Sequence, residues 1–304
     1  VGCVNNDHFR IRGWSERMKN GILIFMLTGL MACQAVPQQE FYQTRDLVAD
    51  GVFTAGIEGP AVGPDGYLYV VNFQKEGTIG RVSSNGKAEL FVNLPEGSTG
   101  NGIRFDSAGD MYVADYTGHN ILKISLQTRD ISVWAHNAAM HQPNDIAITK
   151  SGILFASDPD WKNESGQLWR IDTDGKTQLL ESGMGTTNGV AVSPNQKQLY
   201  VNESVQRNVW MYDLNADGSI SNKRLLIRFD DHGMDGMRCD DQGNLYIARY
   251  GAGVVAVVSP AGKLLREIPL KGKLPTNVAF GGKNNKQVFV TLQDRGAIET
   301  FFIK

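Results

Sequence analysis

Residues 100–135, GNGIRFDSAGDMYVADYTGHNILKISLQTRDISVWA, contain four short runs in which apolar residues alternate with other residues. The runs IRFD, MYVAD, ILKIS and ISVWA have the two-residue period of β-strands, and the Ser-Ala-Gly-Asp segment after the first run favours a tight turn. Four short antiparallel strands within about 40 residues are typical of one blade of a β-propeller.

The centre of this stretch recurs six times along the chain. Its aromatic anchors are spaced 43, 43, 45, 46 and 43 residues apart, and they are Tyr69, Tyr112, Phe155, Tyr200, Tyr246 and Phe289. A fixed period indicates one supersecondary unit that is stacked on copies of itself. The sequence therefore predicts an all-β domain over residues 46–304, a six-bladed β-propeller with four-stranded antiparallel blades. The sixth repeat ends after its third strand, so we expect residues 46–53 (DLVADGVF) to supply the missing outer strand and close the ring.

Composition narrows the functional classes. The formal net charge is −2 and no basic cluster stands out, which gives no reason to expect a nucleic-acid partner. The chain has no G-x-S-x-G, H-E-x-x-H or phosphate-binding glycine motif. Its three cysteines do not form a disulfide framework, and Cys239 is expected to be a small buried residue.

The N-terminal segment has the features of a targeting signal. Residues 18–33 begin with Met-Lys-Asn, continue with the apolar run GILIFMLTGLMA and end at Cys33. This run is too short to span a bilayer and is typical of a secretory signal. Its last four residues, Leu-Met-Ala-Cys, resemble a bacterial lipobox, in which the cysteine is lipidated; the alternative is an ordinary signal peptide with an incidental cysteine. We expect residues 1–17 to be upstream non-native sequence, 18–32 a lipoprotein signal peptide, and 33–45 a lipidated tether to the bacterial cell envelope, on its periplasmic face.

One oxygen-bearing side chain stands eleven or twelve residues before each aromatic anchor. These side chains are Glu58, Asn101, Asn144, Asn188, Asp235 and Asn277. The first strand of each blade lines the propeller axis, so we expect them to form a ring there. Carboxylate and carboxamide oxygens favour a hard cation, and Ca²⁺ tolerates such a set better than Mg²⁺ does. The alternative is that the Asn-Gly and Asp-Gly pairs only form turns, or that the polar residues hold water on the axis.

Several motifs resemble the senescence marker protein/gluconolactonase/luciferin-regenerating enzyme family, in order and at blade spacing across residues 46–304. They are IEGPAVGPDG (57–66), QPNDIA (142–147), TNGVAVSPNQKQLYVN (187–202), MDGMRCDDQGNLYIA (234–248) and PTNVAFGG (275–282). The resemblance implies a six-bladed propeller with Ca²⁺ on the axis, or alternatively Mn²⁺, Zn²⁺ or Mg²⁺. The metal ligands that it implies are Glu58, Asn144, Asn188 and Asp235.

The same resemblance implies a metal-dependent hydrolase of a lactone or related ester. The ion would polarise the carbonyl and lower the pKa of a bound water. Asp235 would be the catalytic residue that orients or deprotonates this water or attacks directly, unless it is a ligand only. The residues expected to face the substrate are Asn101, Gln142, Asn277, His141 and His232. The alternatives are that Asn101 and Asn277 only support the metal ligands and that the two histidines are exposed loop residues. Gln142 stands where members that act on sugar lactones tend to carry Arg, which favours a less hydroxylated substrate.

Two other functions fit the blade pattern. GIRFDSAGDMYVADYTGHNILKI also resembles NHL repeats, so a non-catalytic binding propeller on the cell envelope is the main alternative. A strictosidine synthase-like propeller shares the architecture but lacks the ligand set. The four residues Glu58, Asn144, Asn188 and Asp235 favour the lactonase, because a scaffold does not need them. The sequence leaves the oligomeric state open.

Overall fold

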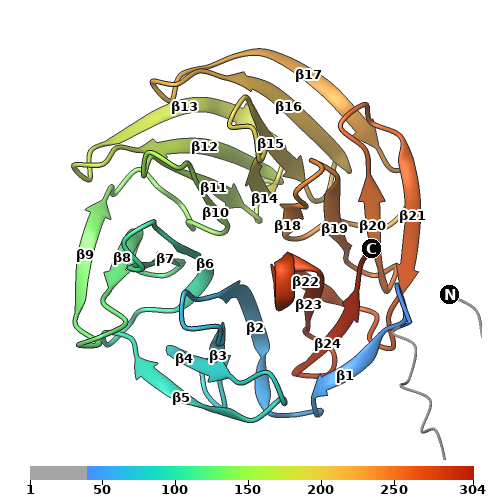
Figure 1. The fold of residues 1–304 in the computed structure, drawn as a ribbon. Coiled ribbons are helices and arrows are strands. Elements are labelled where there is room, and N and C mark those ends of the chain that lie inside the picture. Colours follow the sequence, from blue (N-terminus) through green and yellow to red (C-terminus); the bar gives the residue numbers. More distant parts are fainter. Residues whose placement is uncertain (1–39) are drawn as a thin grey trace, which may run out of the picture. The chain divides into compact units, whose positions relative to one another are not determined.

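Residues 40–304, the part of the chain that this computed structural model describes, contain 24 β-strands and a single 3₁₀ turn (Lys283–Asn285). The strands form six four-stranded sheets around a central axis (Figure 1). The predicted six-bladed β-propeller is confirmed. The predicted signal peptide, Cys33 and most of the tether lie outside the described residues.

Each blade follows the chain outward from the axis, and neighbouring strands are antiparallel. Blade one consists of β2 (Phe53–Val62), β3 (Leu68–Phe73), β4 (Thr78–Val82) and β5 (Ala88–Asn93). Blade two consists of β6 (Gly100–Phe105), β7 (Met111–Asp115), β8 (Asn120–Ile124) and β9 (Ile131–His136). Blade three consists of β10 (Ile146–Ile148), β11 (Leu154–Asp160), β12 (Ser165–Ile171) and β13 (Thr177–Met184). Blade four consists of β14 (Thr187–Val192), β15 (Gln198–Glu203), β16 (Asn208–Leu214) and β17 (Ile220–Arg228). Blade five consists of β18 (Met237–Cys239), β19 (Leu245–Arg249), β20 (Val254–Val258) and β21 (Leu264–Pro269). Blade six consists of β22 (Pro275–Gly281), β23 (Gln287–Leu292), β24 (Ala297–Phe302) and β1 (Arg45–Val48).

The sixth blade combines strands from distant parts of the chain. Strand β1 is its outer strand and pairs antiparallel with β24, with Arg45 opposite Thr300. This strand is shorter than the expected 46–53, because a turn with Gly51 at φ 74° redirects the chain, and Phe53 already belongs to β2. The Arg295 guanidinium, next to β24, pairs with Asp46 and also with Asp50.

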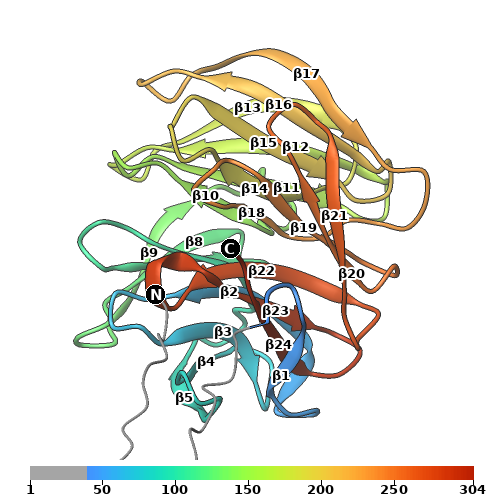
Figure 2. The same cartoon turned by 45° about the vertical axis from the view of Figure 1, so that its right-hand side comes forward.

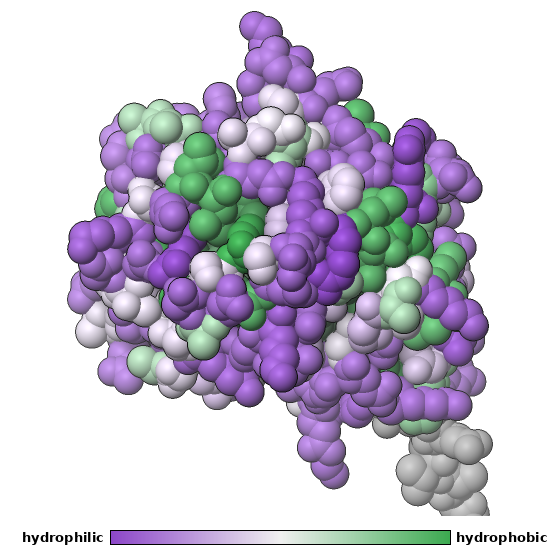
Figure 3. Space-filling view, turned by 90° about the horizontal axis from the view of Figure 1, so that it is seen from above, coloured by the Kyte–Doolittle hydropathy of each residue, from purple (hydrophilic) through white to green (hydrophobic). Residues whose placement is uncertain are grey.

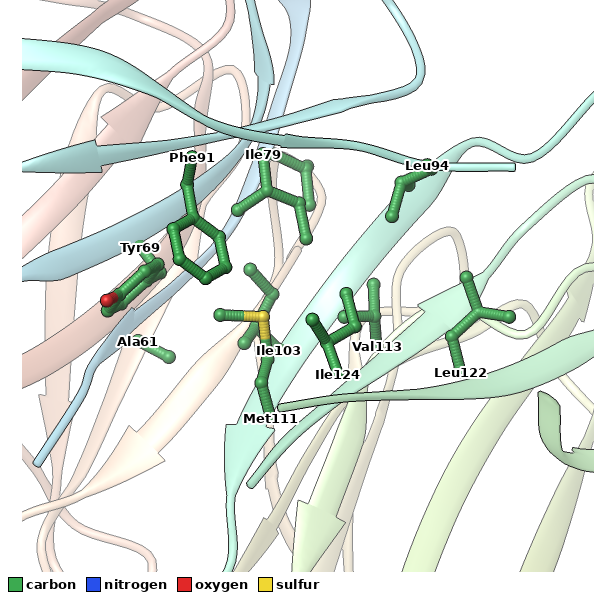
Figure 4. Packing of buried hydrophobic residues seen from close by; sticks show 11 residues of the cluster. Ala61, Tyr69, Ile79, Phe91, Leu94, Ile103, Met111, Val113, Leu122 and Ile124 are labelled. Atoms are coloured by element: carbon green, nitrogen blue, oxygen red, sulfur yellow. The ribbon is translucent and has the colours of Figure 1, made fainter. Parts of the chain in front are cut away.

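The hydrophobic core is divided into clusters between neighbouring blades. Figure 4 shows the cluster between blades one and two, in which the Tyr69 and Phe91 rings meet edge to face with centroids 5.0 Å apart. Ile103 and Met111 of blade two pack into the same cluster and are fully buried. Figure 2 shows how the sheets succeed one another around the ring. Because each sheet packs on the next, the apolar residues of β3, β7 and their equivalents are buried on both faces.

The face of the molecule seen in Figure 3 carries hydrophobic residues in separate patches among hydrophilic ones. The most exposed large hydrophobic residues lie on different outer strands, for example Val133 in β9 and Leu225 in β17. Within residues 40–304, no helix is long and apolar enough to cross a bilayer.

Candidate metal centre on the propeller axis

A cavity of about 270 Å³ lies among the inner strands. Five of the six side chains predicted to form the axial ring line it, from five different blades, and the sixth, Asn277, does not. The residues around the cavity are Ala55, Gly56, Ile57, Glu58, Asn72, Glu76, Thr99, Gly100, Asn101, Tyr116, Asn144, Trp161, Asn188, Asp235, Thr276 and Gln293.

The glycines that follow the ring residues allow the inner strands to approach one another closely. A Cβ atom on Gly59 would lie 1.9 Å from the Asn101 carbonyl oxygen, and one on Gly236 would lie 1.9 Å from the Asn277 side chain. Asn188-Gly189 lies inside strand β14. The Asn-Gly and Asp-Gly pairs therefore serve close packing between blades rather than the turns that are their usual context.

Asn277 supports the site from behind. Its Nδ2 donates a hydrogen bond of 3.0 Å to Oε2 of Glu58. The Gly59 amide also donates to Glu58 Oε2. These two bonds fix the orientation of the Glu58 carboxylate. Asn277 therefore contacts Glu58 but does not itself line the cavity.

Two carboxyl groups of the cavity titrate abnormally in the metal-free protein. Burial, together with the negative charge of Asp145, raises the pKa of Glu58 to about 7. Burial and the nearby Glu58 carboxylate raise the pKa of Asp235 well above its ordinary value. Two buried carboxylates resist ionisation together, and a divalent cation between them would remove the conflict.

Asn188 provides the test of whether these residues suit a cation. The Asn188 side chain is 2% exposed, and its Oδ1 has no hydrogen-bond partner within the described residues. Buried polar atoms are nearly always paired, so this oxygen is available to a water, a ligand or an ion. Together with Asn144 and the carboxylates of Glu58 and Asp235, it forms a set of hard oxygen donors, which fits Ca²⁺. Residues 40–304 contain no cluster of three or more His, Cys, Asp or Glu side chains that could hold a metal, so two carboxamides are essential to the set.

Three largely buried charged side chains, those of Arg104, Asp145 and Arg238, form a triad next to Asn144. Asp145 is 1% exposed, and its carboxylate accepts hydrogen bonds from Arg104 Nη2 at 3.1 Å and Arg238 Nη1 at 3.0 Å. The Val190 amide donates to the same carboxylate at 3.2 Å. Burial and the positive charge of Arg238 lower the pKa of Arg104 to about 9. The triad therefore joins blades two, three and five.

The triad was not predicted from the sequence, although the sequence contains a signal for it. Arg104 and Arg238 each stand eight residues before the aromatic anchor of their repeat, where the other four repeats have Ala, Ala, Val and Gly. Two arginines at this apolar phase, together with the Asp of the P-N-D motif, indicate a buried ion pair. Asn72, Glu76, Thr99, Tyr116, Thr276 and Gln293, which also line the cavity, were missed as well.

A second pocket of about 500 Å³ shares Tyr116 and Trp161 with the axial cavity and contains His141 and Gln142. The backbone amides of His141 and Gln142 donate to the buried Asp158 carboxylate at 2.8 and 2.6 Å. These two residues, which were predicted to face the substrate, are therefore held beside the axial cavity and do not line it.

His232 lines neither of these two pockets. Its side chain is 48% exposed and lies beside Asp231. Asn101 is the only one of the five predicted substrate-facing residues in the wall of the axial cavity.

Comparisons with known proteins agree with this architecture. A gluconolactonase of Zymomonas mobilis is 30% identical over 216 residues, which cover 63% of this chain and 60% of that protein. The chain thus spans less than two thirds of that relative's length. A calcium-binding protein, regucalcin, from Agrobacterium tumefaciens has the same fold, with a TM-score of 0.75 at 20% identity over 87% of this chain and 95% of the other. A gluconolactonase structure from Xanthomonas campestris has a TM-score of 0.74 at 19% identity over 86% and 89% of the two chains.

The family model described as the SMP-30/Gluconolactonase/LRE-like region matches residues 57–294. This match includes all six ring residues and most of the propeller. The chain belongs to the SMP-30/gluconolactonase/LRE-like family.

Proposed function

We propose that the protein is a divalent-metal-dependent hydrolase of a lactone or related ester, with the reaction at the axial cavity. The observation that carries this proposal is the unpaired, buried Asn188 Oδ1 beside two carboxyl groups with raised pKa values. The proposed ligands are Glu58, Asn144, Asn188 and Asp235, and the proposed ion is Ca²⁺. The family and its matched gluconolactonase support a lactone as the substrate class.

The residues of the chain have distinct parts in this reaction. Water adds to the lactone carbonyl carbon, the ring carbon–oxygen bond breaks, and a hydroxy acid forms. Asp235 accepts the proton of the attacking water and returns it to the departing ring oxygen. Asn101 lies in the cavity wall and orients the substrate, while Tyr116 and Trp161 form an aromatic side of the same wall. When bound, the divalent ion supplies Lewis-acid polarisation of the carbonyl and stabilises its developing negative charge.

Chelation tests the proposal. Purified protein is treated with EDTA and assayed on a panel of lactones and aryl esters, then reassayed after addition of Ca²⁺, Mn²⁺, Zn²⁺ or Mg²⁺. We expect EDTA to abolish hydrolysis, Ca²⁺ or Mn²⁺ to restore it, and the ion to raise Tm by mass action. Full activity in protein shown to be free of metal would overturn the mechanism. Absence of hydrolysis across the panel with metal present would favour the NHL-like binding propeller.

We also propose that Cys33 carries a lipid that anchors the propeller to the bacterial envelope. The lipobox-like segment supports this, and Cys33 precedes β1 (Arg45–Val48), which belongs to blade six. Cys33→Ser should release the protein from the membrane fraction while the propeller keeps its fold. A Cys33→Ser protein that remains in the membrane fraction without detergent would contradict the proposal.

A further inference from the structure

Glu76 is a third carboxylate in the wall of the axial cavity, in addition to the two proposed ligand carboxylates. It lies in the loop between β3 and β4, and neither the sequence motifs nor the proposed reaction assigns it a part. Its Oε1 accepts a hydrogen bond of 2.5 Å from the Thr54 hydroxyl. The Gly56 amide in turn donates to Thr54 Oγ1 at 3.0 Å. Glu76 is exposed to solvent, and these bonds hold its carboxylate against the cavity wall.

The surroundings of Glu76 leave one of its oxygens available to a ligand. A Cβ atom on Gly56 would lie 2.8 Å from both carboxylate oxygens, so the carboxylate rests directly on the Gly56 backbone. Within residues 40–304, Oε2 of Glu76 has no hydrogen-bond partner, whereas Oε1 has Thr54. A fixed carboxylate with one free oxygen accepts hydrogen bonds from neutral donors and repels anions.

The charges around the cavity make this repulsion effective. Glu58, Glu76 and Asp235 give the lining a formal charge of −3 when ionised, and a bound divalent cation reduces it to −1. Without Glu76 the same sum is zero. The neighbouring triad adds one positive charge, because the single Asp145 carboxylate offsets only one of Arg104 and Arg238. With the triad included, the sum is zero with Glu76 and +1 without it.

We propose that Glu76 determines the charge specificity of the site: it restricts the substrate to uncharged lactones and esters and promotes departure of the anionic hydroxy-acid product. This inference rests on the proposed function, since it concerns the substrate of the same cavity. A neutral lactone enters without repulsion, and its hydrolysis creates a carboxylate beside Glu76. A unit charge a few ångströms away in a partly solvated site changes anion binding by about tenfold.

Two matched esters test the specificity. The kcat/KM values of p-nitrophenyl acetate and of the anionic mono-p-nitrophenyl succinate are measured with Ca²⁺ for wild type, Glu76→Gln, Glu76→Asp and Glu96→Gln. Glu76→Gln should raise the ratio of the anionic to the neutral ester about tenfold. Glu76→Asp keeps the charge and should keep the wild-type ratio. Glu96→Gln removes an exposed carboxylate that does not line the cavity and serves as the control for net charge.

A binding measurement decides the role of Glu76 without turnover. NMR titration of 4-hydroxybutyrate, the anion formed from γ-butyrolactone, and of neutral γ-butyrolactam gives their Kd values. We expect Glu76→Gln to tighten only the anion, about tenfold. An unchanged anion Kd and ester ratio, or the same change in Glu96→Gln, would overturn the assignment. Wild-type protein that hydrolyses neither lactones nor esters would instead contradict the proposed function, and the titration would still decide whether Glu76 excludes anions.

Discussion

Asp235 is proposed to have two roles, because it both binds the ion and transfers a proton. Asp235→Asn keeps an oxygen donor and nearly the same volume but removes the charge and the proton acceptor. With saturating metal, we expect kcat to fall on the order of 10²-fold or more, the usual scale for loss of a general base, and metal affinity to fall as well. The measurement is kcat at saturating Ca²⁺, together with calorimetric titration of the ion.

Asn188→Asp is the opposite change and serves as the comparison. It adds a negative charge at the oxygen that has no hydrogen-bond partner within residues 40–304, so it should tighten Ca²⁺ binding while making the ion a poorer Lewis acid and lowering kcat. If metal-saturated Asp235→Asn turns over within a few-fold of wild type, Asp235 is a ligand only.

The repeat predicted the positions of the axial residues but not their contacts. Five of the six ring residues line the cavity, since equal phases of equal blades converge on the axis. Glu76 could not be recognised, because its place in the wall depends on the fold of one loop and on Thr54, 22 residues earlier. The contact of Asn277 with Glu58 spans 219 residues and has no local signature.

At the level of strands and turns, some glycines bring neighbouring blades together. Gly86, in the turn between β4 and β5, has φ +84°, and a Cβ on it would lie 2.0 Å from the Leu47 carbonyl oxygen of β1. Gly66, in the turn between β2 and β3, has φ +81°, and no atom of residues 40–304 outside its own immediate chain neighbours lies within 4 Å of its Cβ position. The two glycines therefore share a backbone conformation and differ in their surroundings.

This pair separates backbone strain from packing. Gly66→Ala should cost only the left-handed backbone term, about 1 kcal/mol. Gly86→Ala should cost at least about 1 kcal/mol more, since the backbone carbonyl of β1 must move. Urea unfolding of both variants measures the difference. Equal losses would mean that the contact between the Gly86 turn and β1 is not tight in solution.

The strands themselves were predictable because their pattern is local. Alternating apolar residues and glycine-containing turns recur in every blade, and the aromatic anchors are buried or nearly so. The end of the outermost strand of blade six also has a local signal, since the Asp50-Gly51 pair favours a turn. The turn at Gly51 and the bonds from Arg295 end β1 at Val48.

For the whole molecule, Asp145 joins three blades through one carboxylate. Asp145→Asn would leave Arg104 and Arg238 buried without a full counter-charge, so we expect a loss of about 3 kcal/mol or more in the free energy of unfolding. Asp46→Asn is the matched control, because Asp46 also pairs with two cations, Lys271 and Arg295, but is 38% exposed. It should cost about 1 kcal/mol or less in the same urea titration. Similar losses for both variants would show that burial of the triad has no special effect.

The axial carboxyl groups make the stability of the metal-free protein depend on pH. The pKa of Glu58 is raised from 4.5 to about 7, so the folded state holds a proton that the unfolded chain releases at lower pH. The resulting stabilisation is fully present below about pH 4.5 and is lost as the pH rises through about 7. In EDTA we expect the free energy of unfolding to fall over this window by about 3 kcal/mol.

Calcium should reverse this trend, because it binds the ionised carboxylates. The increase in Tm on adding Ca²⁺ should therefore grow from about pH 5 to about pH 8. Thermal unfolding in EDTA and in Ca²⁺ across this range checks both statements. A Ca²⁺ effect that is independent of pH would place the ion away from Glu58 and Asp235.

The four proposed ligands are divided evenly along the chain. Glu58 and Asn144 precede Gly185, the link between β13 and β14, and Asn188 and Asp235 follow it, so each half contains one carboxylate and one carboxamide. The sixth blade is shared in the same way, since β1 belongs to the first half and β22 to β24 belong to the second. Two separately produced fragments cut at Gly185 would each hold an incomplete centre and an incomplete sheet. Their complementation would depend on calcium, and recovered hydrolysis would report that the two polypeptides had reassembled.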